Sequence, residues 1–149
     1  MLKITIGSDH AGFRLKNLII SRFKSINFND AGTYSEESCD YPDYVLPVGR
    51  AVINGEADFG IVICGTGIGA SVAVNKLKGI RAALCFNEFM AEKSRQHNNA
   101  NVLVLGAKIT GDELALSIVE KWLAASFEGG RHQTRIDKIS AIEDLQGRL

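Results

Sequence analysis

The stretch FGIVICGTGIG, residues 59–69, joins a short apolar run to a glycine-rich turn. Its first half, Phe59–Cys64, is rich in β-branched residues, which predicts a buried β-strand. Its second half has glycine at every second position, which favours a tight turn from a strand into a helix. A strand that leads through such a turn into a helix is the repeating unit of a parallel α/β sheet.

The same unit recurs on both sides of this stretch. Further apolar runs predict strands at residues 2–7, 27–31, 80–85 and 101–105. Helical patterns occupy residues 13–25, 42–53, 71–77, 88–96 and 131 to about 145. The sequence Thr110-x-x-Glu113 is a capping box that is expected to open one more helix, which runs to residue 125. Five alternations of strand and helix predict a mostly parallel five-stranded sheet with helices on both faces.

Composition excludes several classes of protein. The 149 residues contain 17 Lys+Arg and 17 Asp+Glu, and this balance argues against a nucleic-acid or membrane-surface grip. The longest apolar run has five residues, 82–86, and residues 1–13 lack the apolar core of a secretory signal. Three cysteines without a CxxC pair favour a reducing, cytoplasmic location. No pair of His or Cys has metal-ligand spacing, so we expect neither a metal nor a cofactor.

The residues that follow the strands are the candidates for a site. In a parallel α/β sheet, ligands bind beyond the carboxyl ends of the strands, where the strand order reverses. Residues 7–12 follow the first strand and residues 64–69 follow the third. A strand order that begins 2-1-3 makes these two segments neighbours. It is then expected to bring Asp9 and His10 close to Cys64 and the glycine turn.

Each of these features has two interpretations when taken alone. Cys64 lies where a helix N-terminus stabilises a thiolate, but it is equally placed to be a buried core thiol, as we expect for Cys85. The glycine turn either holds an anion on its amides or packs a helix tightly, and it is neither a dinucleotide fingerprint nor a Walker loop. Asp9 is also a common helix cap, and Cys39 is interpreted as incidental.

Basic residues later in the chain are equally open to two interpretations. His97 ends a predicted helix, where a cation is favourable without any chemical role. Arg131 and Arg135 share one helix face and either fork onto a phosphate or meet solvent. The residues alone do not decide between these alternatives.

Five motifs in one order carry a family resemblance. They are GSDHAGF (7–13), DYPDY (40–44), CGTGIGASVAVNK (64–76), SRQHNNANVLVLG (94–106) and EGGRHQTRI (128–136). Nearly end to end, the sequence resembles the type B ribose-5-phosphate isomerases, relatives of galactose-6-phosphate isomerase. The resemblance implies a Rossmann-like α/β/α sandwich formed by one domain, residues 1–149. It implies homodimers or dimers of dimers with sites at the subunit interface. The implied activity is the metal-free interconversion of ribose 5-phosphate and ribulose 5-phosphate in the pentose phosphate pathway.

The resemblance also implies roles for the residues around the thiol. Cys64 corresponds to the base that moves the carbon-bound proton through an enediolate. Thr66 corresponds to the hydroxyl that helps to shuttle a proton. The anion hole for the enediolate corresponds to the backbone of Gly65, Gly67 and Gly69.

Other matched residues are implied to open the sugar ring and to hold the substrate. Asp9 contacts the sugar and assists ring opening, His97 opens the ring, and Asn98 contacts a sugar hydroxyl. The implied phosphate ligands are His10, Arg131 and Arg135, so the last helix is expected to complete the phosphate site. Many relatives have arginine where this chain has Lys108, which keeps the charge but loses the bidentate fork.

One geometric expectation concerns the subunits. A crossover helix runs back along the sheet, so His97 at its end should lie at the opposite edge from Cys64. A strand of five or six residues spans ~17–20 Å. We therefore predict that His97 and Asn98 act in the site of a neighbouring subunit in an isologous dimer.

Three other functions stay open on the sequence alone. The substrate is alternatively a six-carbon sugar phosphate, such as allose 6-phosphate or galactose 6-phosphate. A flavodoxin-like domain that only binds a phosphorylated ligand explains the glycine turn and the arginines, but not Cys64 together with His97. A redox thiol protein is disfavoured because no resolving cysteine lies at close spacing.

Overall fold

The computed structural model describes residues 1–146 as one five-stranded sheet with six helices. In chain order the elements are β1 (Lys3–Ser8), α1 (Phe13–Arg22), β2 (Asn27–Asp30), α2 (Tyr41–Ile53), β3 (Phe59–Cys64), α3 (Ile68–Val74), β4 (Ala82–Leu84), α4 (Glu88–Gln96), β5 (Val102–Gly106), α5 (Asp112–Ala124) and α6 (Arg131–Glu143). The strand order is β2-β1-β3-β5-β4 and every pair is parallel. The predicted fold class and the 2-1-3 order are thus confirmed. Over residues 1–146, no helix is both long and apolar enough to cross a bilayer.

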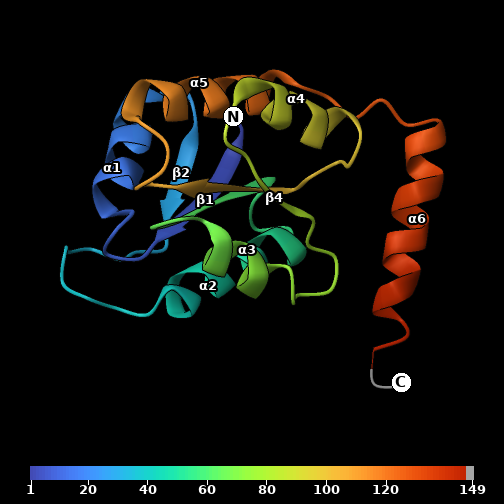
Figure 1. Cartoon of the computed structure of the whole chain (residues 1–149), viewed down its shortest axis with the longest axis horizontal. Helices are drawn as coiled ribbons and strands as arrows, with labels where there is room; N and C mark the ends of the chain where they lie inside the picture. The colour runs from blue at the N-terminus through green and yellow to red at the C-terminus, as the bar shows by residue number, and fades with distance from the viewer. Residues whose placement is uncertain (147–149) are drawn as a thin grey trace.

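Helices cover both faces of the sheet and produce the three layers of Figure 1. Strand β3 shows why this happens. Ile61 and Ile63 point to the face that α1, α4 and α5 cover, whereas Val62 and Cys64 point to the face that α2 and α3 cover. Successive side chains of a strand point to opposite faces of the sheet. An uninterrupted apolar run therefore places apolar side chains on both faces, and helices cover both.

Helix α6 stands outside both layers, along the side of the molecule next to β4 (Figure 1). At its N-terminal end, His132 stacks on His97, the residue that caps α4. At its C-terminal end, the Gly79 N–H donates to Glu143 Oε1 at 2.9 Å. These contacts near its two ends attach α6 to the rest of the chain.

The predicted capping box of α5 is wrong. Gly111 is the N-cap of α5, and no side chain makes a cap hydrogen bond there. Thr110 is buried instead, and its N–H donates to the Gly106 carbonyl oxygen at 2.9 Å. The chain therefore makes a turn directly after β5, and this turn delays the start of the helix to Asp112.

Several other boundaries differ from the prediction, and α1, for example, ends at Arg22 rather than at residue 25. Helix α3 begins at Ile68, three residues before the predicted start at 71, because Gly67 already turns the chain with a φ of 80°. Strand β4 spans three residues rather than the predicted 80–85, and it is an edge strand with a partner on one side only. The early start of α3 matters because it places the first helical turn directly beside Cys64.

Candidate active site

The loops that follow β1, β3 and β5 meet at the carboxyl edge of the sheet. The Asp9 N–H donates to the Ile63 carbonyl oxygen at 3.3 Å, which ties the loop after β1 to β3. The Lys108 N–H donates to the Gly65 carbonyl oxygen at 2.9 Å, which ties the loop after β5 to the glycine turn. Asp9, Lys108 and the glycine turn therefore lie around Cys64, as the predicted strand order requires.

Cys64 is only 4% exposed, and its thiol lies next to a backbone hydrogen-bond donor. Its Sγ accepts a hydrogen bond from the Gly67 N–H at 3.2 Å. The sulfur therefore lies against the backbone at the start of α3, with a donor directed at it. The turn that aims this donor needs glycine at position 67, because φ is 80° and an added Cβ would lie 2.4 Å from Leu84 Cδ1.

The rest of the glycine turn is covered by an aromatic ring that the sequence analysis did not assign. A Cβ at Gly69 would lie 2.5 Å from Cζ and 2.8 Å from the hydroxyl oxygen of Tyr41. Tyr41 belongs to the DYPDY motif. The feature of the sequence that could have indicated its role is an aromatic residue at the start of a helix beside the predicted site. Thr66 lies exposed in the same turn, where its Oγ1 accepts the Ile68 N–H at 3.2 Å and its own proton stays available.

His10 is oriented by a residue that was expected to be incidental. The backbone N–H of Cys39 donates to His10 Nδ1 at 3.2 Å. Since Nδ1 accepts, the proton of the neutral ring lies on Nε2. His10 thus presents an N–H donor, which suits an anionic ligand.

The loop that carries Cys39 is anchored by a partly buried ion pair. The Nζ of Lys16, whose side chain is fully buried, binds both carboxylate oxygens of Asp30, with Oδ2 at 2.7 Å. Asp30 Oδ1 also accepts the Gly32 N–H at 2.9 Å, and the Gly32 carbonyl oxygen accepts the Ser8 N–H at 2.7 Å. The pair therefore fixes the start of the loop against the end of β1.

Asp9 and Lys108 each offer a charge to this edge. Asp9 Oδ1 accepts the Gly12 N–H at 3.2 Å, so Asp9 does brace the turn before α1. Its Oδ2 has no hydrogen-bond partner within residues 1–146 and stays free for a ligand. The Lys108 side chain lies over the turn, because a Cβ at Gly65 would be 3.6 Å from Lys108 Cδ.

The other predicted site residues lie at the opposite edge. The Asn98 carbonyl oxygen accepts the Nε–H of Arg81, the residue before β4, at 3.1 Å. Gly106, which pairs with Cys64, lies four residues beyond the start of β5, or about 13 Å at the rise of a parallel strand. One chain therefore does not bring Asn98 or its neighbour His97 to its own Cys64. Arg131 and Arg135 belong to this distant group because α6 begins beside His97.

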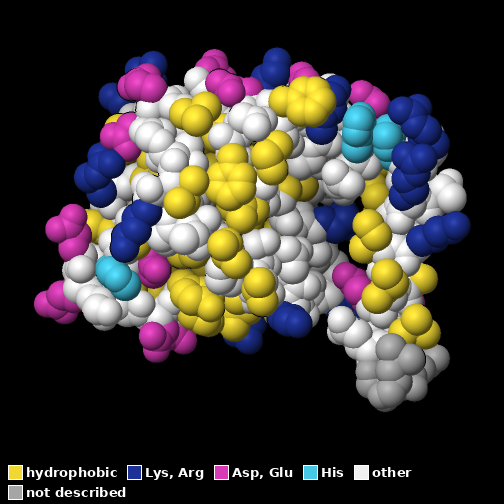
Figure 2. Space-filling model, viewed as in Figure 1, with side chains coloured by type: hydrophobic (Ala, Val, Ile, Leu, Met, Phe, Trp, Pro, Cys, Tyr) yellow, Lys and Arg dark blue, Asp and Glu magenta, His cyan; other side chains and the backbone are white. Residues whose placement is uncertain are grey.

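His97 belongs to a cluster that the sequence analysis did not foresee. Its ring stacks on that of His132, with centroids 4.2 Å apart and planes within 10°. Glu128 Oε2 lies 3.8 Å from His97 Nε2 and 3.6 Å from His132 Nε2. Figure 2 shows two adjacent histidines beside the basic side chains of α6. The missed signal was the i,i+4 spacing of Glu128 and His132.

His97, Glu128 and His132 are residue types that can bind a metal ion, although their spacing in the sequence did not predict a metal site. Their ligand atoms lie within 4.8 Å of one another. An imidazole binds a metal ion with a nitrogen lone pair, which lies in the plane of the ring. Two parallel stacked rings cannot both direct such a lone pair at one ion. The arrangement of His97 and His132 is therefore not a preformed chelate.

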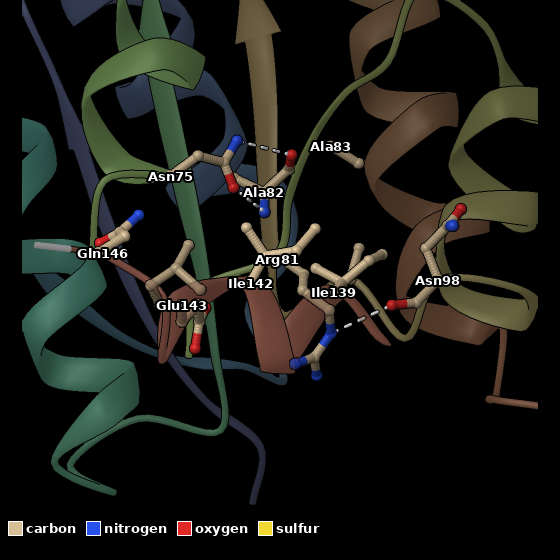
Figure 3. A pocket seen from close by; sticks show the side chains of 11 residues that line it. Asn75, Arg81, Ala82, Ala83, Asn98, Ile139, Ile142, Glu143 and Gln146 are labelled. Carbon is tan, nitrogen blue, oxygen red and sulfur yellow. Dashed lines mark hydrogen bonds between the residues drawn. The ribbon is translucent and has the colours of Figure 1, made fainter. Parts of the chain in front are cut away.

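A hollow of about 470 Å³ separates β4 from α6 (Figure 3). Arg81, Asn98 and Asn75 line it from the sheet side, and Ile139 and Ile142 line it from α6. The thiol site does not open into it, since neither Cys64 nor the glycine turn lines it.

Cys85 is the core thiol that the sequence predicts. It is 1% exposed, and burial raises the pKa of its thiol to about 11, although a hydrogen bond to the Ser94 hydroxyl lowers that pKa in part. Cys85 is therefore a neutral thiol at physiological pH.

A parallel α/β sandwich with a thiol, a carboxylate and a glycine turn at its carboxyl edge is a site for acid–base chemistry on a small anionic molecule. The model of the Ribose/Galactose Isomerase family matches residues 4–139, and the chain belongs to this family. The resemblance drawn from the five sequence motifs is thus confirmed.

Individual relatives narrow the comparison. Ribose-5-phosphate isomerase B of Escherichia coli is 50% identical over 145 residues, which cover 96% of this chain and 97% of the relative. The solved structure of the Clostridium thermocellum ribose-5-phosphate isomerase B has a TM-score of 0.95 and 54% identity, covering 96% of this chain and 98% of that one. The Mycoplasma genitalium ribose-5-phosphate isomerase B, solved with bound ribulose-5-phosphate, has a TM-score of 0.91 and 46% identity, covering 96% of this chain and 97% of that one.

Proposed function

We propose that this chain is an aldose–ketose isomerase that interconverts ribose 5-phosphate and ribulose 5-phosphate. The observation that carries the proposal is the buried Cys64 thiol with the Gly67 N–H directed at its sulfur. The similarity to enzymes named for this reaction supports the choice of substrate. The direct test is to measure rates with ribose, allose and galactose phosphates side by side. Ribose 5-phosphate should react fastest, and a faster six-carbon substrate would overturn the choice.

The proton transfer is assigned to the residues of the glycine turn. Cys64 as thiolate takes the proton from C2 of the open aldose and returns it to C1, which yields the ketose. Thr66 carries the hydroxyl proton between the two oxygens, and amides of the turn stabilise the enediolate. A positioned base contributes ~10²–10⁴ in rate, and each oxyanion donor is typically worth ~10²–10³.

Ring opening and phosphate binding are assigned to the outer parts of the site. Asp9 accepts the proton of the C1 hydroxyl through its free Oδ2, while His97 protonates the ring oxygen and Asn98 binds a sugar hydroxyl. The phosphate is held by His10, Lys108, Arg131 and Arg135. Its binding energy positions the reacting carbons without taking part in the chemistry. We assign no metal or cofactor to these steps.

The complete site is proposed to form between two subunits of a homodimer, or of a dimer of dimers. His97 and the α6 arginines lie at the opposite edge of the sheet from Cys64 of the same chain. Apolar side chains that face solvent support an interface, because Ile68 and Val72 of α3 are 59% and 57% exposed and Phe89 of α4 is 69% exposed. Figure 2 shows hydrophobic side chains gathered over the α3 side and along α6.

Location and domain organisation follow from the same proposal. Cys39, Cys64 and Cys85 are all free thiols, which fits a reducing cytoplasm. We propose that the chain acts as one isomerase domain in which α6 completes the phosphate site of the partner. The last three residues of that domain lie outside the described residues 1–146.

Alkylation should inactivate the enzyme through Cys64 alone when Cys39 is replaced by alanine. Cys39 is half-buried near His10 and would also react, whereas the Cys39 N–H that orients His10 survives the substitution. At pH 7.5 Cys85 is overwhelmingly a neutral thiol, because burial raises its pKa to about 11. Mass spectrometry after iodoacetamide treatment should therefore find modified Cys64 and unmodified Cys85, with protection by ribose 5-phosphate. Modification of Cys64 with full retention of activity would contradict its role.

Arg135→Ala should raise KM for ribose 5-phosphate by about tenfold or more, with a smaller loss of kcat. The guanidinium of Arg135 lies on the exposed face of α6, one turn from Arg131, so both can reach one phosphate. Steady-state kinetics check this, with Lys138→Ala, a loss of charge further along α6, as the matched control. An unchanged KM for Arg135→Ala would assign that residue to solvent.

A further inference from the structure

Among residues 1–146, Glu128 is the one carboxylate within ion-pair distance of the stacked histidine pair beside α6. The rings of His97 and His132 are parallel and 4.2 Å apart, and Glu128 Oε2 lies within 3.8 Å of Nε2 in both. His132 is the inner ring, with a side chain only 6% exposed and an Nε2 that has no hydrogen-bond partner. His97 is the outer ring, with 35% of its side chain exposed.

Burial and the positive charges around it disfavour a proton on the inner ring, that of His132. Burial lowers the pKa of His132, and the positive charges of His97, Arg131 and Arg135 lower it further, whereas Glu128 raises it. Two stacked imidazolium ions would repel each other. The outer ring, that of His97, faces both solvent and the carboxylate of Glu128.

The position of Glu128 does not depend on its side chain. Its backbone N–H donates to the carbonyl oxygen of Gln96, the last residue of α4, at 3.0 Å. The residue next to Gln96 is His97, so this bond holds the carboxylate beside the ring it faces. A change of the Glu128 side chain leaves the backbone bond in place.

We propose that Glu128 is a positioning residue for ring opening: its carboxylate holds the Nε2 edge of His97 while His132 fixes the ring plane by stacking, so that Nδ1 of His97 delivers the proton. The proposal rests on the proposed function. His97 as imidazolium gives its Nδ1 proton to the ring oxygen of the furanose, and the bond from C1 to that oxygen breaks. The proton of the C1 hydroxyl goes to the Asp9 carboxylate, which leaves the open aldehyde. Proton exchange with water then restores both groups.

The test separates ring opening from proton transfer at carbon. Ribulose 5-phosphate cannot close a furanose ring, because its C5 oxygen carries the phosphate. Incorporation of solvent deuterium at C1 of ribulose 5-phosphate therefore needs Cys64 but no ring opening. Net conversion of ribose 5-phosphate needs both steps. Nuclear magnetic resonance and a coupled assay measure the two rates on the full-length protein.

Glu128→Gln should lower net conversion by about tenfold or more and leave deuterium incorporation within about twofold of the wild type. Glu128→Asp keeps the carboxylate and should recover much of the lost conversion. The matched control is Glu120→Gln, which removes the same charge from an exposed position on α5 and should change neither rate.

Two results would overturn the proposal. Conversion by Glu128→Gln at the wild-type rate would show that His97 needs no such support. An equal fall of conversion and deuterium incorporation would show that Glu128 has only a structural role, which is to hold α6 in place. If the wild-type protein itself converts no ribose 5-phosphate, the proposed function fails instead.

Discussion

Cys64→Ser should lower the turnover number by a factor of about 10²–10⁴ or more while the protein remains folded. Serine keeps the shape of the residue and accepts the Gly67 N–H that now reaches sulfur at 3.2 Å. Its hydroxyl, however, is far too weak an acid to supply an anionic base at neutral pH. The formation of ribulose 5-phosphate measures the loss, and thermal unfolding confirms that the fold survives.

The matched control for the loss of a thiol is Cys85→Ala. Cys85 is a buried core thiol, so its removal should lower the melting temperature slightly and leave kcat unchanged. Deuterium incorporation adds a second readout, because Cys64→Ser should lose exchange and conversion together. Substantial turnover by Cys64→Ser would remove the thiol from the mechanism.

The layers of the fold were predictable because β3 and its turn carry the information locally. Ile61 and Ile63 face one layer, and Val62 and Cys64 face the other, so the apolar run alone indicates a sheet buried on both sides. Boundaries were less predictable, since they depend on contacts between elements. Thr110 matches a capping box in sequence, yet its N–H is taken by the turn after β5.

The candidate site was predictable only where it follows strands. Asp9 and the glycine turn come directly after β1 and β3, and Cys64 is the last residue of β3, so the strand order is enough to bring them together. Tyr41 was missed because its contact with Gly69 depends on how α2 packs over the turn. The backbone contact of Cys39 with His10 was missed because it depends on the path of a long loop.

The family resemblance assigned His97, Asn98 and the α6 arginines to the site, but local sequence patterns could not place α6 in space. The position of α6 depends on contacts between residues far apart in sequence, such as His97 with His132 and Gly79 with Glu143. The expectation that His97 ends α4, away from Cys64, needed only the direction of a crossover helix. That expectation leads to the claim that two chains share each site.

Mixing two inactive variants tests the shared site most directly. Cys64→Ser lacks the base, and His97→Ala lacks the ring-opening acid, so each homodimer alone should be inactive in net conversion. The variants are unfolded together, refolded and compared with each variant refolded alone. Native mass spectrometry shows how much of the mixed dimer has formed.

If each site takes Cys64 from one chain and His97 from the other, every mixed dimer has one doubly damaged site and one intact site. With random pairing, half of the dimers are mixed, so activity should return to about one quarter of the wild-type value. If both residues come from one chain, every site keeps one lesion. Absence of recovered activity in a sample that contains mixed dimers would contradict the shared site.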